Sequence, residues 1–297
     1  MSIWEAAVLG VVQGLTEFLP VSSTAHLLVA RQLLGHAQPG DAFTTVVQLG
    51  TLVAVLAYFR ADIAAILAAL LHDARTLRFG SRPESRLAWL IALGSVPVVV
   101  AGFTLKKWLK ATFYDLGTMG LVAILFALLM AAVEVWVTVR RGRNLPETDE
   151  RGITVTQALW VGLWQSLALM PGASRSGTTV TGALFAGLSR AAAARFSFLL
   201  SLPSVFGAGV KELYDEYKLL KTPDATDHVS LFASSDDLAS LAVGTVVSAV
   251  VGYAAVAWLM HFLKRYSLGV FVAYRLIFGV LLLVLVHGGG VAAGAKP

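Results

Sequence analysis

The sequence has 297 residues, of which 57% are hydrophobic and only 14% are charged, with a formal net charge of +5. Soluble domains average about 45–50% apolar and about 25% charged residues, and a soluble fold of this length has too little interior to hide so much apolar surface. The composition therefore excludes a soluble enzyme and a nucleic-acid binder. Cysteine is absent, which also excludes a disulfide-linked secreted module. We expect an integral membrane protein in contact with lipids, and its basic balance is explained by Arg and Lys in cytoplasmic loops.

Taken in chain order, the apolar segments form two kinds of element. The N-terminus carries Glu5 and no basic stretch, so a cleaved signal peptide is not expected. The regions 3–35 and 155–190 are apolar but interrupted, at 18–23 and at 170–177, by a proline and several hydroxyl groups. The apolar stretch on each side of an interruption is short, so each region fits a re-entrant helical hairpin better than a complete span. Stretches long enough to span a membrane are predicted at 42–59, 87–105, 117–139, 194–210, 238–260 and 268–288.

This order of elements occurs twice. A broken hairpin and three spans make up repeat 1, about 1–140, and the same order recurs in repeat 2, about 152–290, with a shift of about 152 residues. Because three crossings per half is an odd number, the second half lies upside down relative to the first. The sequence therefore predicts an all-α polytopic protein with one membrane domain, 1–297, built as an inverted-topology repeat whose site lies where the two broken hairpins meet.

The charges of the loops predict the orientation. Segments 73–86 and 140–156 each carry four arginines and are placed in the cytoplasm, whereas loop 211–237 is acidic and falls outside. Both termini are then outside as well. Three basic residues run against this trend, since the crossing count also puts them outside: Lys106, Lys107 and Lys110.

The first interruption gathers groups suited to metal binding and proton transfer. Gln13 and Glu17 are four residues apart on one face of the entering helix, and Ser23 and His26 share a face of the returning helix. A carboxylate in an apolar region is costly to bury and usually functional. Glu17 and Gln13 offer hard oxygen ligands to Mg²⁺ or Ca²⁺, and His26 is suited to take a proton from Ser23 or from water. The plainer alternatives are that Glu17 is a satisfied polar core group or lies in a headgroup region, and that His26 is structural.

The second interruption is suited to a phosphate group. Its glycines let backbone N–H groups approach an anion, the following helix adds a partial positive charge, and Arg175 supplies a planar fork of donors. The ending Gly-Lys-Ser/Thr of a Walker loop is missing. The alternative is a capped bend with Arg175 reaching lipid headgroups. The residues expected to bind substrate phosphate are Ser22, Ser174, Arg175, Ser176, Gly177, Thr178 and Thr179.

Two further polar residues fall inside predicted spans. Gln48 is interpreted as the donor or acceptor of an interhelical hydrogen bond rather than as a ligand. Arg275 is expected to neutralise a carboxylate or to reach a membrane interface.

At the two interruptions the chain resembles the undecaprenyl-diphosphate phosphatase family, also called bacitracin-resistance proteins. The block from Gln13 to His26 is similar to that family's Glu/Gln-x-x-x-Glu element with its following Ser-Ser-x-x-His, and Pro171 to Thr179 is similar to its Pro-Gly-x-Ser-Arg-Ser-Gly block. The resemblance covers essentially the whole chain. Gln13 is a variable point, where many members carry Glu, so this site would hold its ion less tightly if a second carboxylate is needed.

The resemblance implies hydrolysis of undecaprenyl diphosphate, a polyprenyl diphosphate lipid, with Mg²⁺ or Ca²⁺ as cofactor. It also implies a site that opens to the outer face of the bacterial inner membrane. In the mechanism we expect, Ser23 attacks phosphorus while His26 takes its proton, or His26 activates water directly; the catalytic residues are Glu17, Ser23, His26 and Arg175, and Glu17 and Gln13 hold the metal. The alternative is a secondary transporter or lipid flippase for an anionic substrate. The oligomeric state is left open, a homodimer included.

Overall fold

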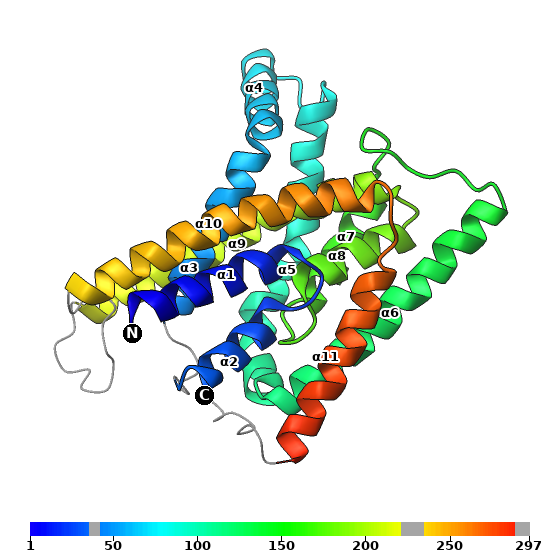
Figure 1. The fold of residues 1–297 in the computed structure, drawn as a ribbon. Coiled ribbons are helices and arrows are strands. Elements are labelled where there is room, and N and C mark those ends of the chain that lie inside the picture. Colours follow the sequence, from blue (N-terminus) through cyan, green and yellow to red (C-terminus); the bar gives the residue numbers. More distant parts are fainter. Residues whose placement is uncertain (36–41, 221–234, 289–297) are drawn as a thin grey trace.

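The computed structural model describes residues 1–35, 42–220 and 235–288, and in these residues it contains eleven α-helices and no strand longer than an isolated bridge (Figure 1). In chain order the helices are α1 (Ile3–Phe18), α2 (Ser23–Leu33), α3 (Ala42–Tyr58), α4 (Arg60–Thr76), α5 (Pro83–Phe113), α6 (Leu116–Gly142), α7 (Val155–Leu167), α8 (Arg175–Phe185), α9 (Arg190–Leu220), α10 (Ser235–Leu263) and α11 (Gly269–His287).

The helical, membrane-spanning architecture predicted from the sequence is confirmed at this level. Five of the described helices are long and apolar enough to cross a membrane, or six elements if α3 and α4, which are bent by 73° at residue 59, count as one broken span. The six predicted spans fall on α3, α5, α6, α9, α10 and α11. The interrupted regions are two pairs of short helices, α1–α2 and α7–α8.

Two parts of the chain differ from the prediction. The predicted loop 211–237 is helical at both ends, because α9 continues to Leu220 and α10 begins at Ser235. Residues 221–234 and all the acidic side chains of this loop lie outside the described part of the chain, as do the side chains of Lys106, Lys107 and Lys110. The helix α4 has no counterpart among the predicted elements. Its apolar run, 61–71, contains Asp62 and is too short to span a membrane, so hydropathy alone passes over it.

The two pairs of short helices begin and end in the same way. Ser2 and Thr154 each cap their helix through a reciprocal pair of hydrogen bonds, with Glu5 and with Gln157. A proline follows the end of each first helix. The residues that cap α2 and α8, Ser22 and Ser174, both have positive φ angles, +77° and +69°, a conformation in which the chain can reverse direction within a few residues.

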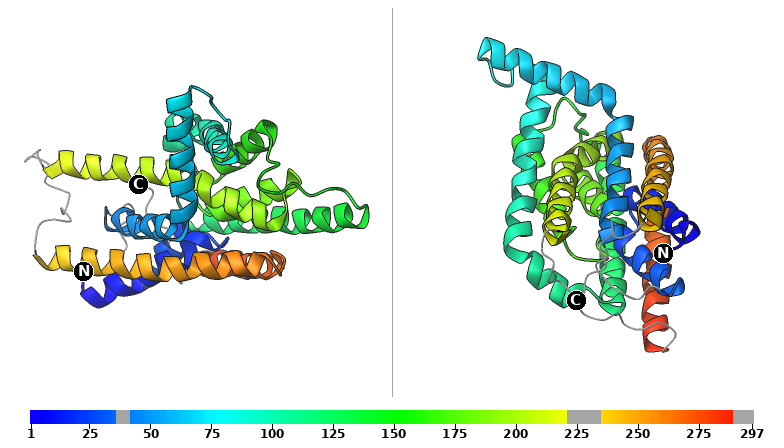
Figure 2. Two further views of the ribbon diagram at one scale, coloured as in Figure 1. Left: turned by 90° about the horizontal axis from the view of Figure 1, so that it is seen from above. Right: turned by 90° about the vertical axis from the view of Figure 1, so that its left-hand side faces the viewer.

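The helices pack through small residues. In Figure 1, α1 (blue) lies along α10 (orange) and α6 (green) lies along α11 (red), and the left-hand view of Figure 2 also shows α1 beside α10. α3 also packs on α10, and α7 packs on α5, where a Cβ atom at Gly162 would lie only 2.0 Å from the carbonyl oxygen of Gly94. Helix α8 lies at the centre of the molecule, and its residues from Ser176 to Leu184 are all buried. Both interruptions are thereby held inside the protein.

Candidate active site

The tips of the two interrupted regions meet. Nη2 of Arg175, at the start of α8, donates to Oε1 of Glu17, near the end of α1, over 2.8 Å. Only 7% of the Glu17 side chain and 25% of the Arg175 side chain are exposed. Ser176 adds a second link, because its hydroxyl donates to the carbonyl oxygen of Leu19 over 3.1 Å. The predicted convergence of acid and guanidinium therefore occurs in the structure, at side chains 158 positions apart in the chain.

Glu17 is the centre of the hydrogen-bond network. Its Oε2 accepts from Nε2 of Gln13 (3.1 Å) and from the hydroxyl of Ser23 (2.7 Å), while its Oε1 also accepts from Nε2 of Gln48 on α3 (3.3 Å). The interhelical hydrogen bond predicted for Gln48 is present, and its partner is the catalytic candidate itself. Together with the guanidinium of Arg175, four donors satisfy one carboxylate, as a buried charge requires.

Arg275 holds the two interruptions together from α11. This side chain is fully buried, and its guanidinium donates to three carbonyl oxygens: Pro20 in the first interruption (3.2 Å), Gly172 in the second (3.0 Å) and Ala123 on α6 (3.3 Å). The expectation of a carboxylate partner or an interfacial position for Arg275 was wrong. Backbone carbonyls freed by the breaks in the helices need donors at this depth, and Arg275 supplies them.

His26 has different partners from those expected. Its Nδ1 lies 2.7 Å from the carbonyl oxygen of Ser22, which can only accept, so Nδ1 carries the proton. Its Nε2 lies 2.6 Å from the hydroxyl of Tyr274 on α11, and the ring stacks on Phe278 with 4.0 Å between centroids. The hydroxyl of Ser23 is therefore paired with Glu17, and the imidazole with Tyr274.

The start of α8 is shaped by its own hydroxyl groups. Ser174 accepts from the N–H of Gly177 (3.2 Å), and the hydroxyls of Thr178 and Thr179 both donate to the carbonyl oxygen of Arg175 (2.9 and 2.8 Å). Thr178 is fully buried. Of the residues predicted to bind phosphate, Gly177, Thr178 and Thr179 thus stabilise the turn that presents Arg175.

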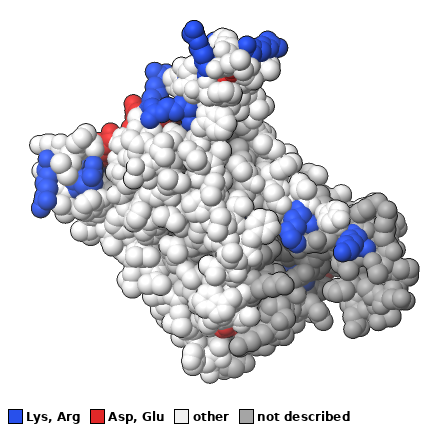
Figure 3. Space-filling view, turned by 180° about the vertical axis from the view of Figure 1, so that it is seen from behind, with Lys and Arg blue, Asp and Glu red and all other residues white. Residues whose placement is uncertain are grey.

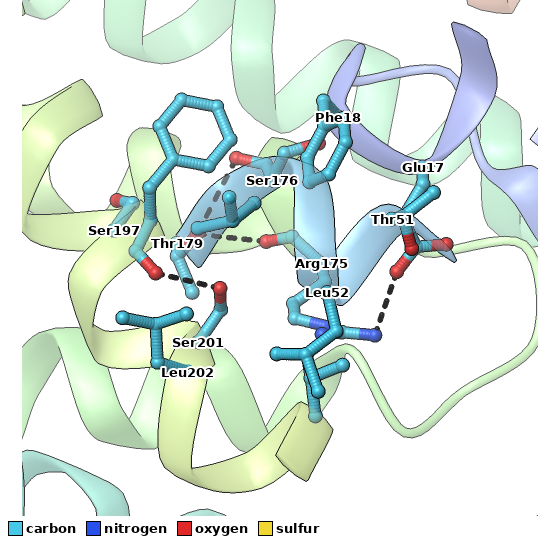
Figure 4. Close-up of a pocket in the computed structure, with 13 residues that line it drawn as sticks. Glu17, Phe18, Thr51, Leu52, Arg175, Ser176, Thr179, Ser197, Ser201 and Leu202 are labelled. Carbon is cyan, nitrogen blue, oxygen red and sulfur yellow. Dashed lines mark hydrogen bonds and ion pairs between the residues drawn. The ribbon is translucent and has the colours of Figure 1, made fainter. Parts of the chain in front are cut away.

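Two cavities share Glu17 and Arg175. One is polar and is lined by Ser22, Ser23, Gln48, Ser174 and Arg175, among others. The other is mainly apolar and runs between α3 and α9; Figure 4 shows Glu17 and Arg175 pointing toward one another at its edge. Its apolar lining consists of Phe18, Leu52, Val55, Phe198, Leu202 and Val205. The ion pair therefore stands where a polar pocket borders an apolar groove.

Sequence reasoning identified the charged pair but missed two contributors to the site. Tyr274 and the role of Arg275 depend on α11 crossing beside both interruptions, and the available signal was the adjacent Tyr-Arg pair inside an apolar span. Among the described residues no three His, Cys, Asp or Glu side chains form a metal cluster. The side chains that contact Glu17 are instead the neutral ones of Gln13, Gln48 and Ser23, beside Arg175.

Comparisons with known proteins match nearly the whole chain. The family model described as bacitracin resistance protein BacA matches residues 6–281. A protein of Prosthecochloris aestuarii is 43% identical over 293 residues, 99% of this chain and all of that protein. A protein of Chloroherpeton thalassium is 46% identical over 295 residues, 99% of this chain and all of that protein, and one of Chlorobium chlorochromatii is 45% identical over 291 residues, 98% and 99% of the two chains. Each of the three is named undecaprenyl-diphosphatase.

Proposed function

The chain belongs to the bacitracin resistance protein BacA family, and from this membership we propose that it hydrolyses undecaprenyl diphosphate at the Glu17–Arg175 site. The products are undecaprenyl phosphate and inorganic phosphate, so the enzyme recycles the lipid carrier of cell-wall synthesis. One observation carries the assignment of the site: the ion pair separates a polar pocket from an apolar groove, and the substrate is a diphosphate joined to a long apolar chain. The transporter alternative is not favoured, because the relatives are named as phosphatases.

In this proposal the two cavities bind different parts of the substrate. The diphosphate enters the polar pocket, where Arg175 offers the bidentate donor geometry that phosphate oxygens prefer. Ser22 and Ser174 line the same pocket and add hydroxyl donors. The first isoprene units follow the apolar groove between α3 and α9, where Leu52 and Phe198 face them.

A divalent cation, Mg²⁺ or Ca²⁺, fits the residues around Glu17. The carboxylate of Glu17 is surrounded by the hydroxyl of Ser23 and by the amide groups of Gln13 and Gln48, whose nitrogens donate to it. If each amide turned to present its oxygen, the set would offer only oxygen ligands, which hard cations prefer. When bound, the ion supplies charge stabilisation for the phosphoryl group. With a single carboxylate among them, these residues would hold the ion only weakly in the absence of substrate.

We propose Ser23 as the nucleophile and Glu17 as the group that takes its proton. The Ser23 hydroxyl already donates to Oε2 of Glu17 over 2.7 Å. A bond forms between Oγ of Ser23 and the terminal phosphorus as the P–O bond to the lipid phosphate breaks; undecaprenyl phosphate leaves with the electron pair, and the proton moves to Glu17. Water then hydrolyses the phosphoserine to phosphate and restores Ser23. Arg175 stabilises the charge on the transferred group, which is the main requirement of phosphoryl transfer.

The second mechanism has water attack phosphorus directly, with His26 as its base. In the structure His26 is held by Ser22 and Tyr274, so this role requires the imidazole to exchange Tyr274 for a water molecule. Trapping of labelled phosphate on Ser23 supports the covalent route. Retention of most turnover in Ser23→Ala supports the direct one.

The architecture that we propose is an inverted repeat with re-entrant hairpins at α1–α2 and α7–α8. Three helix starts support it, because Ile3 and Val155, Ser23 and Arg175, and Pro83 and Ser235 are each 152 positions apart. The packing is reciprocal as well: α1 lies on α10 and α7 lies on α5, which exchanges equivalent helices between the halves. We further propose that the site opens to the outer face of the bacterial inner membrane, since the arginine-rich segments 73–86 and 140–156 are expected in the cytoplasm.

Phosphate release from undecaprenyl diphosphate by the purified protein in detergent tests this function. We expect turnover that a chelator abolishes and that Mg²⁺ or Ca²⁺ restores. Glu17→Ala and Arg175→Ala should each reduce it by about 100-fold or more, the usual effect of losing an acid–base group or a charge clamp. His26→Ala should have an effect of this size if water attacks directly with His26 as its base. A folded wild-type protein that releases no phosphate would exclude the phosphatase, and a near-normal variant would remove its residue from the mechanism.

A further inference from the structure

The end of α4 forms an ordered turn that leads into α5. Leu77 and Gly80 have positive φ angles, +52° and +71°. The carboxylate of Asp73 accepts from the N–H of Gly80 (2.7 Å) and from the hydroxyl of Ser81 (2.5 Å), which ties the turn back to the helix. We call residues 60–89 the α4–α5 hairpin. Its tip is thus a fixed surface, held by its own hydrogen bonds.

The direction of α4 sets this hairpin apart from the rest of the molecule. α4 is bent by 73° from α3, and in the right-hand view of Figure 2 it runs across the top between the ends of α3 and α5. It packs mainly along α5. If α3 and α5 span the membrane, a helix at this angle lies close to the plane of its surface.

The surface of the hairpin is apolar although it is exposed. Leu71 is 53% exposed, and in the turn Leu77 and Phe79 are 77% and 68% exposed. The ring of Phe79 meets Trp89 edge to face, with 6.2 Å between centroids. Leucine and aromatic side chains of this kind are found where a helix lies with one face in the headgroup and acyl boundary of a bilayer.

Three arginines border this apolar surface. Arg75, Arg78 and Arg82 are exposed, and no hydrogen bond or ion pair joins their guanidinium groups to another residue in the described part of the chain. Other arginines on the molecule are used internally: Arg86 donates to the carbonyl oxygen of Ile153, and Arg195 pairs with Asp62 and Glu150. Figure 3 shows Lys and Arg side chains at the top of the molecule, above a wide uncharged surface. The carboxylate of Glu84 is close to them in the sequence, and among the described residues no hydrogen bond or ion pair joins it to another group.

We propose that the α4–α5 hairpin is a docking surface for anionic phospholipids, with Leu71, Leu77 and Phe79 below the headgroups. Arg75, Arg78 and Arg82 bind the phosphates of these lipids. The charge of the surface selects an anionic partner, and its exposed leucines select a lipid over a soluble anion. Each basic residue near such a surface strengthens binding about fivefold. The hairpin then determines how deep α3 lies in the bilayer, and α3 carries Gln48 of the active site.

Native mass spectrometry of the full-length protein tests this proposal. The protein is purified from vesicles of phosphatidylcholine and phosphatidylglycerol, and bound lipids are counted. We expect the wild type to retain phosphatidylglycerol, and the variant Arg75→Gln/Arg78→Gln/Arg82→Gln to lose this preference by roughly 100-fold. The matched control, Arg143→Gln/Lys264→Gln/Arg265→Gln, removes the same charge from other exposed positions and should keep the preference. Phosphate release in detergent, where the hairpin has no role, should be unchanged in both variants and reports that they fold.

A second measurement uses the absence of cysteine, which leaves a single introduced cysteine unique. Oxygen, which partitions into lipid, should speed the spin relaxation of a nitroxide label at Leu71→Cys. A water-soluble paramagnetic reagent should do the same for a label at Arg143→Cys. Equal loss of phosphatidylglycerol in both triple variants would overturn the proposal. So would a label at position 71 in water, or spin–spin broadening that shows a second copy of the chain covering the hairpin.

Discussion

Glu17 and Arg175 neutralise each other in the structure. In the proposed complex each of them would also bind a ligand of opposite charge. A cation would be held by the carboxylate, and the diphosphate by the guanidinium. The 2.8 Å contact between them therefore competes with both. Binding of the cation frees Arg175 for phosphate, and binding of phosphate frees Glu17 for the cation. The two ligands are expected to bind cooperatively, each raising the affinity for the other.

Arg175→Gln should affect metal binding and turnover in opposite directions. Loss of the guanidinium leaves the Glu17 carboxylate without its counter-charge, so the affinity for Mn²⁺ or Mg²⁺ in the absence of lipid should rise by about tenfold; the effect is moderate because Arg175 is partly exposed. Turnover should fall by about 100-fold or more. Calorimetric titration of the metal measures the first quantity. Arg143→Gln is the control, and equal metal affinity in Arg175→Gln and the wild type would refute the competition.

Arg275 should matter for folding more than any exposed arginine. Arg275→Leu leaves the carbonyl oxygens of Pro20 and Gly172 buried without this donor, whereas Ala123 keeps its hydrogen bond within α6. Each unsatisfied carbonyl costs about 1–3 kcal/mol. We expect a loss of about 3 kcal/mol or more in the free energy of unfolding, seen as a lower melting temperature in detergent. Arg275→Lys keeps the charge but cannot reach three carbonyls, so it should be intermediate. A melting temperature equal to the wild type in Arg275→Leu would contradict the clamp.

The sequence predicted the charged pair of the site but not the groups that hold it. Glu17 and Arg175 could be recognised because a charge in an apolar region is rare and costly. The partners of Arg275 are backbone carbonyls, which leave no signature in side-chain patterns. His26 was matched with Ser23 because the two lie on one face of α2. Its actual neighbours, Tyr274 and Phe278, come from α11, and no spacing rule reaches that far along the chain.

At the scale of the helices, close crossings at glycine position the two interruptions. α7 leads into the second interruption and crosses α5 where Gly162 faces the carbonyl of Gly94. Without a hydrophobic driving force between helices in lipid, such small-residue contacts are a main source of association. The position of α7 along the axis of α5 then determines where Arg175 lies. These contacts could not be derived from the sequence, because it contains 27 glycines and most of their neighbours come from distant segments.

Gly162→Ala and Gly102→Ala should therefore behave in opposite ways. A methyl group at position 162 would stand 2.0 Å from a backbone oxygen, so α7 must move away from α5, whereas nothing lies within 4 Å of a methyl group at position 102 on α5. We expect Gly162→Ala to lower both the melting temperature and turnover, and Gly102→Ala to be neutral or to gain about 0.5–1 kcal/mol from its helix propensity. Melting curves and phosphate release measure both. A Gly162→Ala protein as stable and active as the wild type would show that the crossing does not position the site.

For the molecule as a whole, the inverted repeat that we propose would explain why a single polar site forms at the centre. Ser22 and Ser174 are 152 positions apart and share an unusual positive φ, so each interruption reverses the chain in the same way. α1 and α7 each lie on the long helix of the other half. Two half-length elements brought in from opposite sides can meet tip to tip, whereas two from the same side would lie next to each other. An inverted arrangement would thus bring Glu17 into contact with Arg175.

This argument predicts on which side of the membrane equivalent positions lie. Ile3 and Val155 are 152 positions apart, begin α1 and α7, and have similar exposed fractions, 54% and 50%. In the inverted arrangement, Ile3→Cys faces outward and Val155→Cys faces the cytoplasm. In intact cells a membrane-impermeant maleimide should therefore label Ile3→Cys readily, and Val155→Cys only after the membrane is permeabilised; the chain has no other cysteine. Labelling of both from the same side would mean that the halves are parallel, and the two interruptions would then need another route to the contact between Glu17 and Arg175.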